Sequence, residues 1–209
     1  MTSELIFYTN PMSRGQIIRW MLEEVGAPYD TEILDYATGM KSAEYRAINP
    51  MMKVPAIAHK GRVVTEAAAI CAYLADVFPE AGLGPREEEK ADYYRWLFFA
   101  AGPLEQAVTN KAAGFEGTEQ QQRMFGYGHY DLAVNTLADH LAGRDYVCGS
   151  RFNAADVYVG SAVMWGTQFG TLPKLDSFTA YADRLAQREA YKRGKEEDNL
   201  LISEMQAAG

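Results

Sequence analysis

Residues 49 to 67, NPMMKVPAIAHKGRVVTEA, combine a backbone edge and charged side chains suited to holding a small ligand. Pro55 opens a run of strand composition, and because proline has no N–H for a ladder, it belongs at a strand start or edge. The backbone of Val54 is then left free to pair with a ligand. Since only about 5–6% of X-Pro bonds in folded proteins are cis, the local sequence by itself favours a trans bond here.

A helix start follows this strand and supplies a site for an anion. His59 to Arg62 predicts a hairpin turn, and the alanine-rich run that begins at Ala67 predicts a helix. The unpaired N–H groups of a helix start attract carboxylate or phosphate. Lys53 and Glu66 add one charge of each sign. Taken singly, Lys53 fits a solvated side chain, and Glu66 fits an acid that favours the helix dipole.

The elements expected before this segment place it in a small mixed sheet. Leu5 to Thr9 alternates as a strand, and Tyr29 to Leu34 fits a second one. Between them apolar residues repeat at helical spacing, Ser13 is a candidate cap, and Gly26 stops the helix. Residues 41–48 fit a short helix. Together with the hairpin and its helix, the order is β-α-β-α-β-β-α, which is thioredoxin-like, with helices on both faces of the sheet.

The rest of the chain has a different character. Residues 80–86 have the turn-rich composition of a linker, and strand signals are nearly absent after them. Asn153 followed by Asp156 is a strong helix-start signal. The sequence therefore predicts an α/β thioredoxin-like domain at residues 1–79 and an all-helical domain at residues 87–209. Periodicity places its helices at roughly 87–112, 119–141, 154–170, 177–188 and 196–206.

Composition limits the possible classes of function. The chain has 209 residues, 48% of them apolar, and a formal charge of −8, so we expect a real core and no nucleic-acid surface. The start MTSELIFYTN does not resemble a secretory signal, and no stretch approaches about eighteen apolar residues, which predicts a cytoplasmic protein without a membrane span. Cys71 and Cys148 have no metal-type spacing, so we expect core thiols and no metal.

Three motifs together carry a resemblance to a known family. They are KVP at residues 53–55, TEAAAICAYLAD at 65–76 and FNAADV at 152–157, and PMSRGQIIRWMLEE at the first helix adds support. With them the chain resembles, over nearly its whole length, a cytosolic glutathione transferase, close to bacterial members. The resemblance implies a cis Val54-Pro55 bond, glutathione as co-substrate, a homodimer and a role in detoxification.

The resemblance also implies which residues bind glutathione. The backbone of Val54, beside Pro55, would pair with the tripeptide in antiparallel fashion. Lys53 would meet the glycyl carboxylate. Glu66 and the backbone N–H of Ala67 would hold the ammonium and carboxylate of the γ-glutamyl end. Many members have a serine where this chain has Ala67, so one hydroxyl contact is missing here.

The chemistry required is a lower pKa for the glutathione thiol, because the thiolate is the nucleophile. Ser13 lies at the start of the first helix, where serine-type members keep their catalytic hydroxyl and where the helix dipole adds to its effect. Tyr8 ends the first strand, where tyrosine-type members carry theirs. We favour Ser13 because PMSRG resembles bacterial proteins of the serine type. The simpler interpretations are helix capping for Ser13 and an ordinary strand aromatic for Tyr8.

An electrophile would bind between the halves, against Met12 and the aromatic residues Trp96, Phe99 and Tyr127, although helical spacing by itself favours burial of these rings. The leading hypothesis is a transferase that adds the glutathione thiolate to apolar electrophiles. One alternative is a glutathione-dependent peroxidase, disulfide reductase, dehalogenase or isomerase. Another is a binding protein without catalysis on the same fold.

Overall fold

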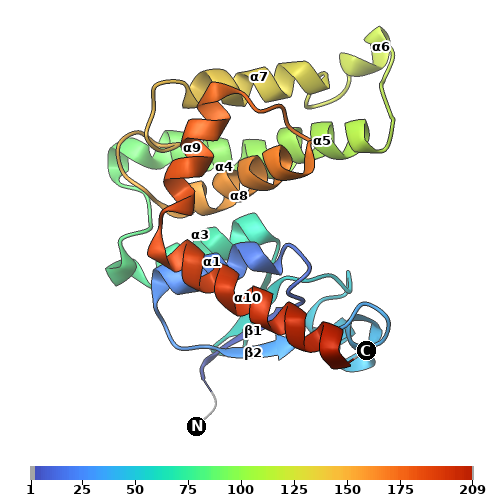
Figure 1. Cartoon of the computed structure of the whole chain (residues 1–209), viewed down its shortest axis with the longest axis vertical. Coiled ribbons are helices and arrows are strands. Elements are labelled where there is room, and N and C mark those ends of the chain that lie inside the picture. The colour runs from blue at the N-terminus through green and yellow to red at the C-terminus, as the bar shows by residue number, and fades with distance from the viewer. Residues whose placement is uncertain (1–2, 209) are drawn as a thin grey trace. The chain divides into compact units, whose positions relative to one another are not determined.

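The computed structural model describes residues 3–208, which form two units (Figure 1). The first unit contains the chain up to Gly84 and again from Arg188 onward, and the second runs from Pro85 to Gln187. The change of unit after Gly84 lies within the segment expected to be a linker. The return of the chain to the first unit after residue 187 differs from the prediction, which placed all of residues 87–209 in the helical domain.

The first unit is built on a four-stranded mixed sheet with the order β2-β1-β3-β4. β1 is parallel to β2 and antiparallel to β3, and β3 forms a hairpin with β4. Lys60 and Gly61 at the hairpin turn have φ of 51° and 75°, the two positive values that a type I′ turn requires. The strands are β1 (Leu5–Thr9), β2 (Asp30–Ile33), β3 (Ala56–His59) and β4 (Arg62–Thr65).

Helices cover both faces of this sheet, as predicted. The ring of Phe7 in β1 lies 5.2 Å from the guanidinium of Arg19 in α1, whereas the next residue, Tyr8, has its ring 5.7 Å from that of Tyr45 in α2. Successive strand side chains point to opposite faces, so α1 and α2 lie on opposite sides of β1. The thioredoxin-like fold class is therefore confirmed. The helices are α1 (Gly15–Val25), α2 (Ala43–Ile48) and α3 (Ala67–Val77), and α3 packs against α1.

The fourth helix of this unit, the long α10 (Glu189–Ala208), packs along α1 (Figure 1). Gly194 permits the close approach, because a Cβ there would lie 3.2 Å from Cγ of Arg19. Ion pairs join the same two helices, with Arg193 Nε 3.0 Å from Glu23 Oε2. The expected helix at 196–206 thus begins seven residues earlier, at Glu189, and belongs to the thioredoxin-like unit.

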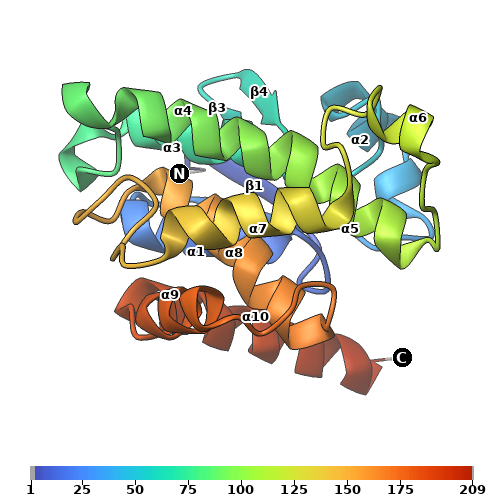
Figure 2. The same ribbon diagram turned by 90° about the horizontal axis from the view of Figure 1, so that it is seen from above.

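The second unit is entirely helical among its described elements. α4 pairs with α8, α5 with α7, and α9 packs against α7 and α8 (Figure 2). A π-helical segment, Ala100–Leu104, which contains Pro103, joins α4 to α5. The helices are α4 (Lys90–Phe99), α5 (Glu105–Ala112), α6 (Glu119–Gln122), α7 (Tyr130–Leu141), α8 (Ala154–Phe169) and α9 (Asp176–Ala186). A short 3₁₀ turn in this unit occupies Glu87–Glu89, and two more in the first unit occupy Gly39–Lys41 and Pro79–Ala81.

Two helix starts in this unit show how local sequence acts. The single helix expected over 119–141 is broken, and α7 starts anew where the ring Nδ1 of His129 accepts from Leu132 N–H at 3.2 Å. The signal at Asn153 is confirmed, since its side chain accepts from Ala155 N–H at 2.9 Å and Asp156 accepts from Asn153 N–H at 3.0 Å. Asp156 also accepts from the hydroxyl of buried Tyr181 at 2.7 Å.

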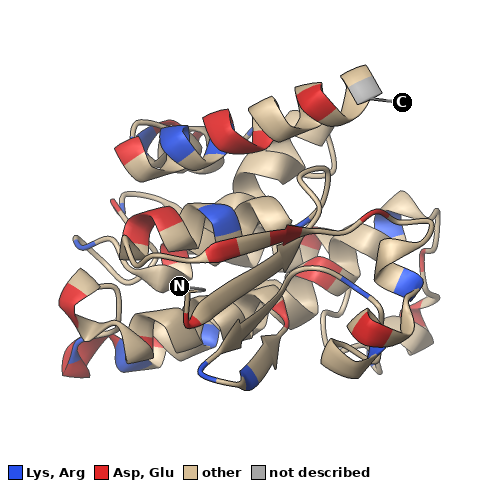
Figure 3. Ribbon diagram, turned by 90° about the horizontal axis from the view of Figure 1, so that it is seen from below, with Lys and Arg blue, Asp and Glu red and all other residues tan. Residues whose placement is uncertain are grey.

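Charge and hydropathy add two facts. Acidic and basic residues are interspersed along the ribbon (Figure 3), with a formal excess of eight negative charges in the chain. Within residues 3–208, no helix combines the length and apolar character that crossing a membrane would require.

Candidate functional site

The strand register brings three predicted segments together at one end of the strands, where β1 ends, β3 begins and β4 ends. Tyr8 of β1 pairs with Ala56 of β3, and Ala56 pairs in turn with Thr65 of β4. Pro55 precedes Ala56, and Glu66 follows Thr65, so the antiparallel pairing places both at the same end of the hairpin. The loop after β1, which carries Ser13, leaves the sheet at this end as well. Residues far apart in the sequence thus share one edge.

The bond between Val54 and Pro55 is cis, as the resemblance implied. The N–H and C=O of Val54 lie outside the β-ladder, whose first pair is Ala56 with Thr65. The preceding carbonyl, that of Lys53, accepts from the Tyr45 hydroxyl at 2.6 Å and from Nδ2 of Asn49 at 2.8 Å. Sequence analysis missed Tyr45 and Asn49. The signal that could have indicated these bonds is Asn49 itself, which lies in the segment 49–67. A buried asparagine side chain needs hydrogen-bond partners.

Glu66 forms the corner between β4 and α3. Its φ of 67° is rare for a residue other than glycine, and such backbone strain is concentrated at ligand sites. Among the described side chains none caps the start of α3, so the first N–H groups, beginning with that of Ala67, remain available to an anion. The carboxylate of Glu66 is exposed, as is the side chain of Lys53, and neither has an ion-pair partner among residues 3–208.

Ser13 lies in the turn just before α1. Its Oγ accepts from Gly15 N–H at 2.9 Å and donates to the Asn10 carbonyl at 2.6 Å. A serine has one hydroxyl proton, and here that proton is bonded to Asn10. Asn10 is buried and holds the loop in place by donating from Nδ2 to the Leu34 carbonyl at 2.9 Å. The Ser13 side chain therefore supports the turn that leads into α1, whose N-cap residue is Arg14.

Tyr8 occupies a different place at the same edge. Its ring packs on that of Tyr45, and its hydroxyl makes no hydrogen bond with the described part of the chain. Burial, and then the negative charge of Glu32 on β2, raise the pKa of Tyr8 above its ordinary value. Tyr8 therefore keeps its proton at neutral pH and remains a possible donor.

The four residues expected to contact an electrophile have different surroundings. Met12 is exposed in the first unit. Trp96 is 1% exposed, with its ring 4.0 Å from that of His140, so it is a core residue and not a pocket wall. This corrects its assignment, because only exposed surface can contact a ligand. Phe99 is half-buried and packs against the cluster that contains Tyr127.

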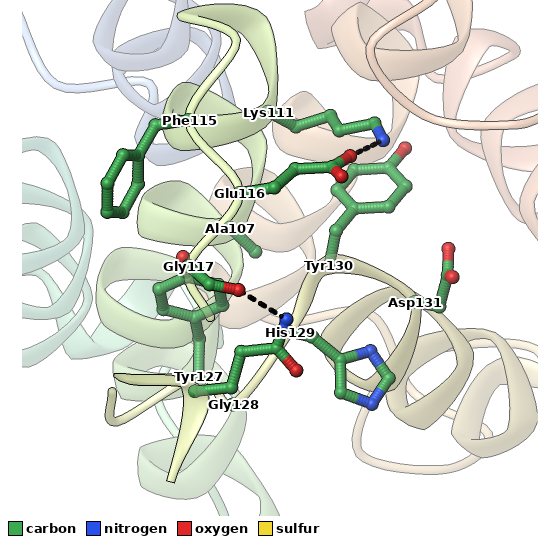
Figure 4. A pocket seen from close by; sticks show the side chains of 11 residues that line it. Ala107, Lys111, Phe115, Glu116, Gly117, Tyr127, Gly128, His129, Tyr130 and Asp131 are labelled. Atoms are coloured by element: carbon green, nitrogen blue, oxygen red, sulfur yellow. Dashed lines mark hydrogen bonds and ion pairs between the residues drawn. The ribbon is translucent and has the colours of Figure 1, made fainter. Parts of the chain in front are cut away.

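Tyr127 lines a cavity of about 250 Å³ within the helical unit (Figure 4). Its hydroxyl accepts from Asn110 Nδ2 at 2.9 Å, and its ring stacks on that of Phe125. Lys111 and Glu116 form an ion pair at this cavity. Its other walls include Ala107, Phe115, Gly117, Gln122, Gly128, His129, Tyr130 and Asp131.

Neither cysteine is suited to be a nucleophile. Cys71 is fully buried, and burial raises the pKa of its thiol far above the ordinary range. Burial also raises the pKa of Cys148 to about 12. Since the thiolate is the reactive form, both are inert at neutral pH.

Comparison with known proteins identifies a related family. Residues 12–77, which contain Ser13, Pro55 and Glu66, match the family described as glutathione S-transferase, N-terminal domain. In this segment the chain is similar to glutathione transferases. Its match to the glutathione S-transferase GST-4.5 of Xanthomonas campestris pv. campestris is 29% identical and covers 82% of this chain and 89% of that relative.

Solved structures of glutathione transferases share the fold over nearly the whole chain. The transferase of Methylococcus capsulatus superimposes with a TM-score of 0.76 at 25% identity and covers 94% of this chain and 99% of its own. The theta-class transferase of Xanthomonas axonopodis pv. citri, with glutathione bound, gives 0.71 at 25% identity and covers 92% and 97%. Both glutathione transferases are bacterial, which agrees with the resemblance seen in the sequence.

Proposed function

We propose that this protein is a glutathione transferase, which binds glutathione where β1 ends, β3 begins and β4 ends and uses its thiolate to attack apolar electrophiles. One observation carries the proposal: the cis Pro55, the open backbone of Val54 and the uncapped start of α3 meet at one edge. Glutathione is bound in two bacterial transferases of this fold, those of Xanthomonas axonopodis pv. citri and of a sphingomonad.

The proposed contacts follow the charges of the tripeptide. The cysteinyl backbone pairs with the N–H and C=O of Val54 in antiparallel fashion beside Pro55. The exposed ammonium of Lys53 meets the glycyl carboxylate. The carboxylate of Glu66 accepts from the γ-glutamyl ammonium, and the N–H of Ala67 donates to the γ-glutamyl carboxylate.

Ser13 is the proposed thiol activator. Its Oγ already accepts from Gly15 N–H at 2.9 Å, which polarises the hydroxyl and strengthens it as a donor. On binding, the sulfur replaces the Asn10 carbonyl as acceptor of the serine proton, and the thiol proton passes to water. The start of α1 adds a favourable dipole. Tyr8, whose hydroxyl makes no hydrogen bond within residues 3–208, is the alternative donor.

The thiolate then forms a bond from its sulfur to the electrophilic carbon, and either a leaving group departs or the product anion takes a proton. Exposed Met12, half-buried Phe99 and Tyr127, which lines the cavity, remain the proposed contacts of the electrophile. Trp96 is withdrawn because only 1% of its surface is exposed. A peroxidase, disulfide reductase, dehalogenase or isomerase would use the same thiolate.

We also propose a cytoplasmic homodimer with a role in detoxification. α4 exposes Tyr94 and Phe98, one helical turn apart, with 48% and 73% of their surfaces open. Adjacent exposed aromatic side chains on a helix are typical of a surface that meets a partner. A second copy of this chain is the proposed partner.

Calorimetric titration with glutathione tests the central proposal. We expect saturable binding at one site per chain, followed by turnover on a panel of apolar electrophiles. Turnover confined to peroxides or disulfides would favour the alternative enzymes. Binding without any turnover would favour the non-catalytic protein, and absence of binding would reject the site.

A further inference from the structure

The carbonyl of Lys53 receives more hydrogen bonds than its exposed position requires. It accepts from the hydroxyl of Tyr45 at 2.6 Å and from Nδ2 of Asn49 at 2.8 Å. Both donors are buried, with 3% and 4% of their surfaces exposed. A carbonyl oxygen has two lone pairs, so these donors occupy both of them.

The two donors are themselves held rigidly. Asn49 accepts at Oδ1 from Met51 N–H at 3.0 Å, and its own N–H donates to the Tyr45 carbonyl at 2.8 Å. The Tyr45 ring packs against Tyr8 of β1. Burial raises the pKa of Tyr45 to about 12, so its hydroxyl keeps the proton it donates. The end of α2 and residues 51–53 thus form one hydrogen-bonded loop.

Because the peptide group is planar, the direction of the Lys53 carbonyl also sets the direction of the Val54 N–H at the proposed glutathione site. The Lys53 carbonyl and the Val54 N–H belong to one peptide group, in which the two point in opposite directions. Two bonds that aim the carbonyl at α2 therefore aim the N–H away from it. The following bond, to Pro55, is cis.

We propose that Tyr45 and Asn49 are positioning residues for glutathione, which orient the Val54 N–H toward the cysteinyl carbonyl of the tripeptide. This inference rests on the proposed function. Neither residue touches the ligand, and their effect passes through one backbone plane. It also gives Tyr8 a structural task, the support of the Tyr45 ring.

Tyr45→Phe and Asn49→Ala test the proposal by glutathione titration. A single hydrogen bond is worth about 0.5–1.5 kcal/mol, so we expect each variant to raise the Kd of glutathione by about three- to tenfold. The KM for glutathione should rise by the same factor, while kcat at saturation stays unchanged. Tyr73→Phe is the matched control, since it loses a hydroxyl bond to His59 Nδ1 (3.0 Å) in the same unit. Its Kd should equal that of the parent protein.

A ligand variant separates positioning from general destabilisation. A glutathione analogue with a trans-alkene in place of the cysteinyl-glycyl peptide bond lacks the cysteinyl carbonyl and cannot accept from the Val54 N–H. It should bind the parent protein weakly, and Tyr45→Phe should weaken it no further. Equal losses for both ligands, or parent-like affinity in both Tyr45→Phe and Asn49→Ala, would overturn the inference. If the parent protein itself fails to bind glutathione, the proposed function fails first.

Discussion

Arg19 of α1 and Asp198 of α10 form an ion pair inside the first unit, with Nε 3.4 Å from Oδ1 and side chains that are 0% and 1% exposed. Arg19 also donates from Nη1 to the Tyr29 hydroxyl at 2.9 Å. The pair ties the last helix of the chain to the helix that begins beside Ser13. The C-terminal helix is therefore a structural part of the unit that carries the proposed glutathione site.

Arg19→Met should strongly destabilise the protein. It leaves the Asp198 carboxylate buried without its cation, and breaking a buried ion pair in this way costs about 3–5 kcal/mol. The control is Arg193→Ala, because Arg193 pairs with Glu23 at 3.0 Å but is 55% exposed, and such pairs contribute about 0–1 kcal/mol. Urea unfolding measures both. Equal losses of stability in the two variants would contradict the prediction.

Asp198 should make stability depend on pH. Burial raises the pKa of Asp198 to about 6 in the folded protein, against about 3.9 in an unfolded chain. The folded state therefore binds the proton more tightly, so this contribution to stability is present below about pH 4 and is lost as pH rises through about 6.

At about 1.4 kcal/mol per pKa unit, the change amounts to roughly 2–3 kcal/mol. Asp198→Asn removes the titration. The free energy of unfolding of the parent, relative to that of Asp198→Asn, should fall between pH 4 and pH 7. A difference that is flat across this range would show that Asp198 does not titrate there.

Ser13→Ala should raise the pKa of bound glutathione by about one to two units, because the thiolate loses a charge-assisted hydrogen bond. Turnover near pH 7 should fall accordingly. Tyr8→Phe, which keeps the ring against Tyr45, should leave the thiol titration almost unchanged. Ultraviolet absorbance of the thiolate against pH measures both. A shift in Tyr8→Phe alone would transfer the role to Tyr8, and a shift in neither would leave the start of α1 as the activator.

Lys53→Ala and Glu66→Ala should each weaken glutathione binding by about 1.5–3 kcal/mol, the range for hydrogen bonds to charged groups. Both side chains are exposed, so the fold should stay intact. Lys60→Ala is the control, because Lys60 lies in the hairpin turn and its Nζ is 3.6 Å from exposed Glu4. Calorimetry gives the three affinities. Parent-like values for Lys53→Ala and Glu66→Ala together would remove the assignment of the site.

The protein should be a homodimer, and Phe98→Glu should shift it to the monomer by placing a charge on the proposed apolar surface of α4. Phe169→Glu is the control, since Phe169 is 71% exposed at the end of α8. Light scattering at micromolar concentration measures the mass. A monomeric parent protein would refute the proposal, and dissociation by Phe169→Glu alone would move the interface.

Local signals in the sequence determined most of the fold. The alternation in Leu5–Thr9, the stop at Gly26 and the cap at Asn153 each act within a few residues, and the structure has each of them. The break between α6 and α7 was missed because helical spacing continues through residues 123–129, whose backbone is not helical. The C-terminal helix was placed in the wrong unit for another reason. Periodicity shows that a helix has an apolar face but not which element that face meets.

The sequence by itself also predicted the binding motif, because Lys53, Pro55 and Glu66 lie close along the chain and the charges of Lys53 and Glu66 complement those of glutathione. Tertiary structure decided what holds that motif. The bonds from Tyr45 and Asn49 to one carbonyl, and the pair of Arg19 with Asp198, depend on the path of the backbone in space. Arg19 and Asp198 are 179 positions apart. A hydrogen bond needs its atoms within about 3 Å of each other, and only the folded chain creates that proximity.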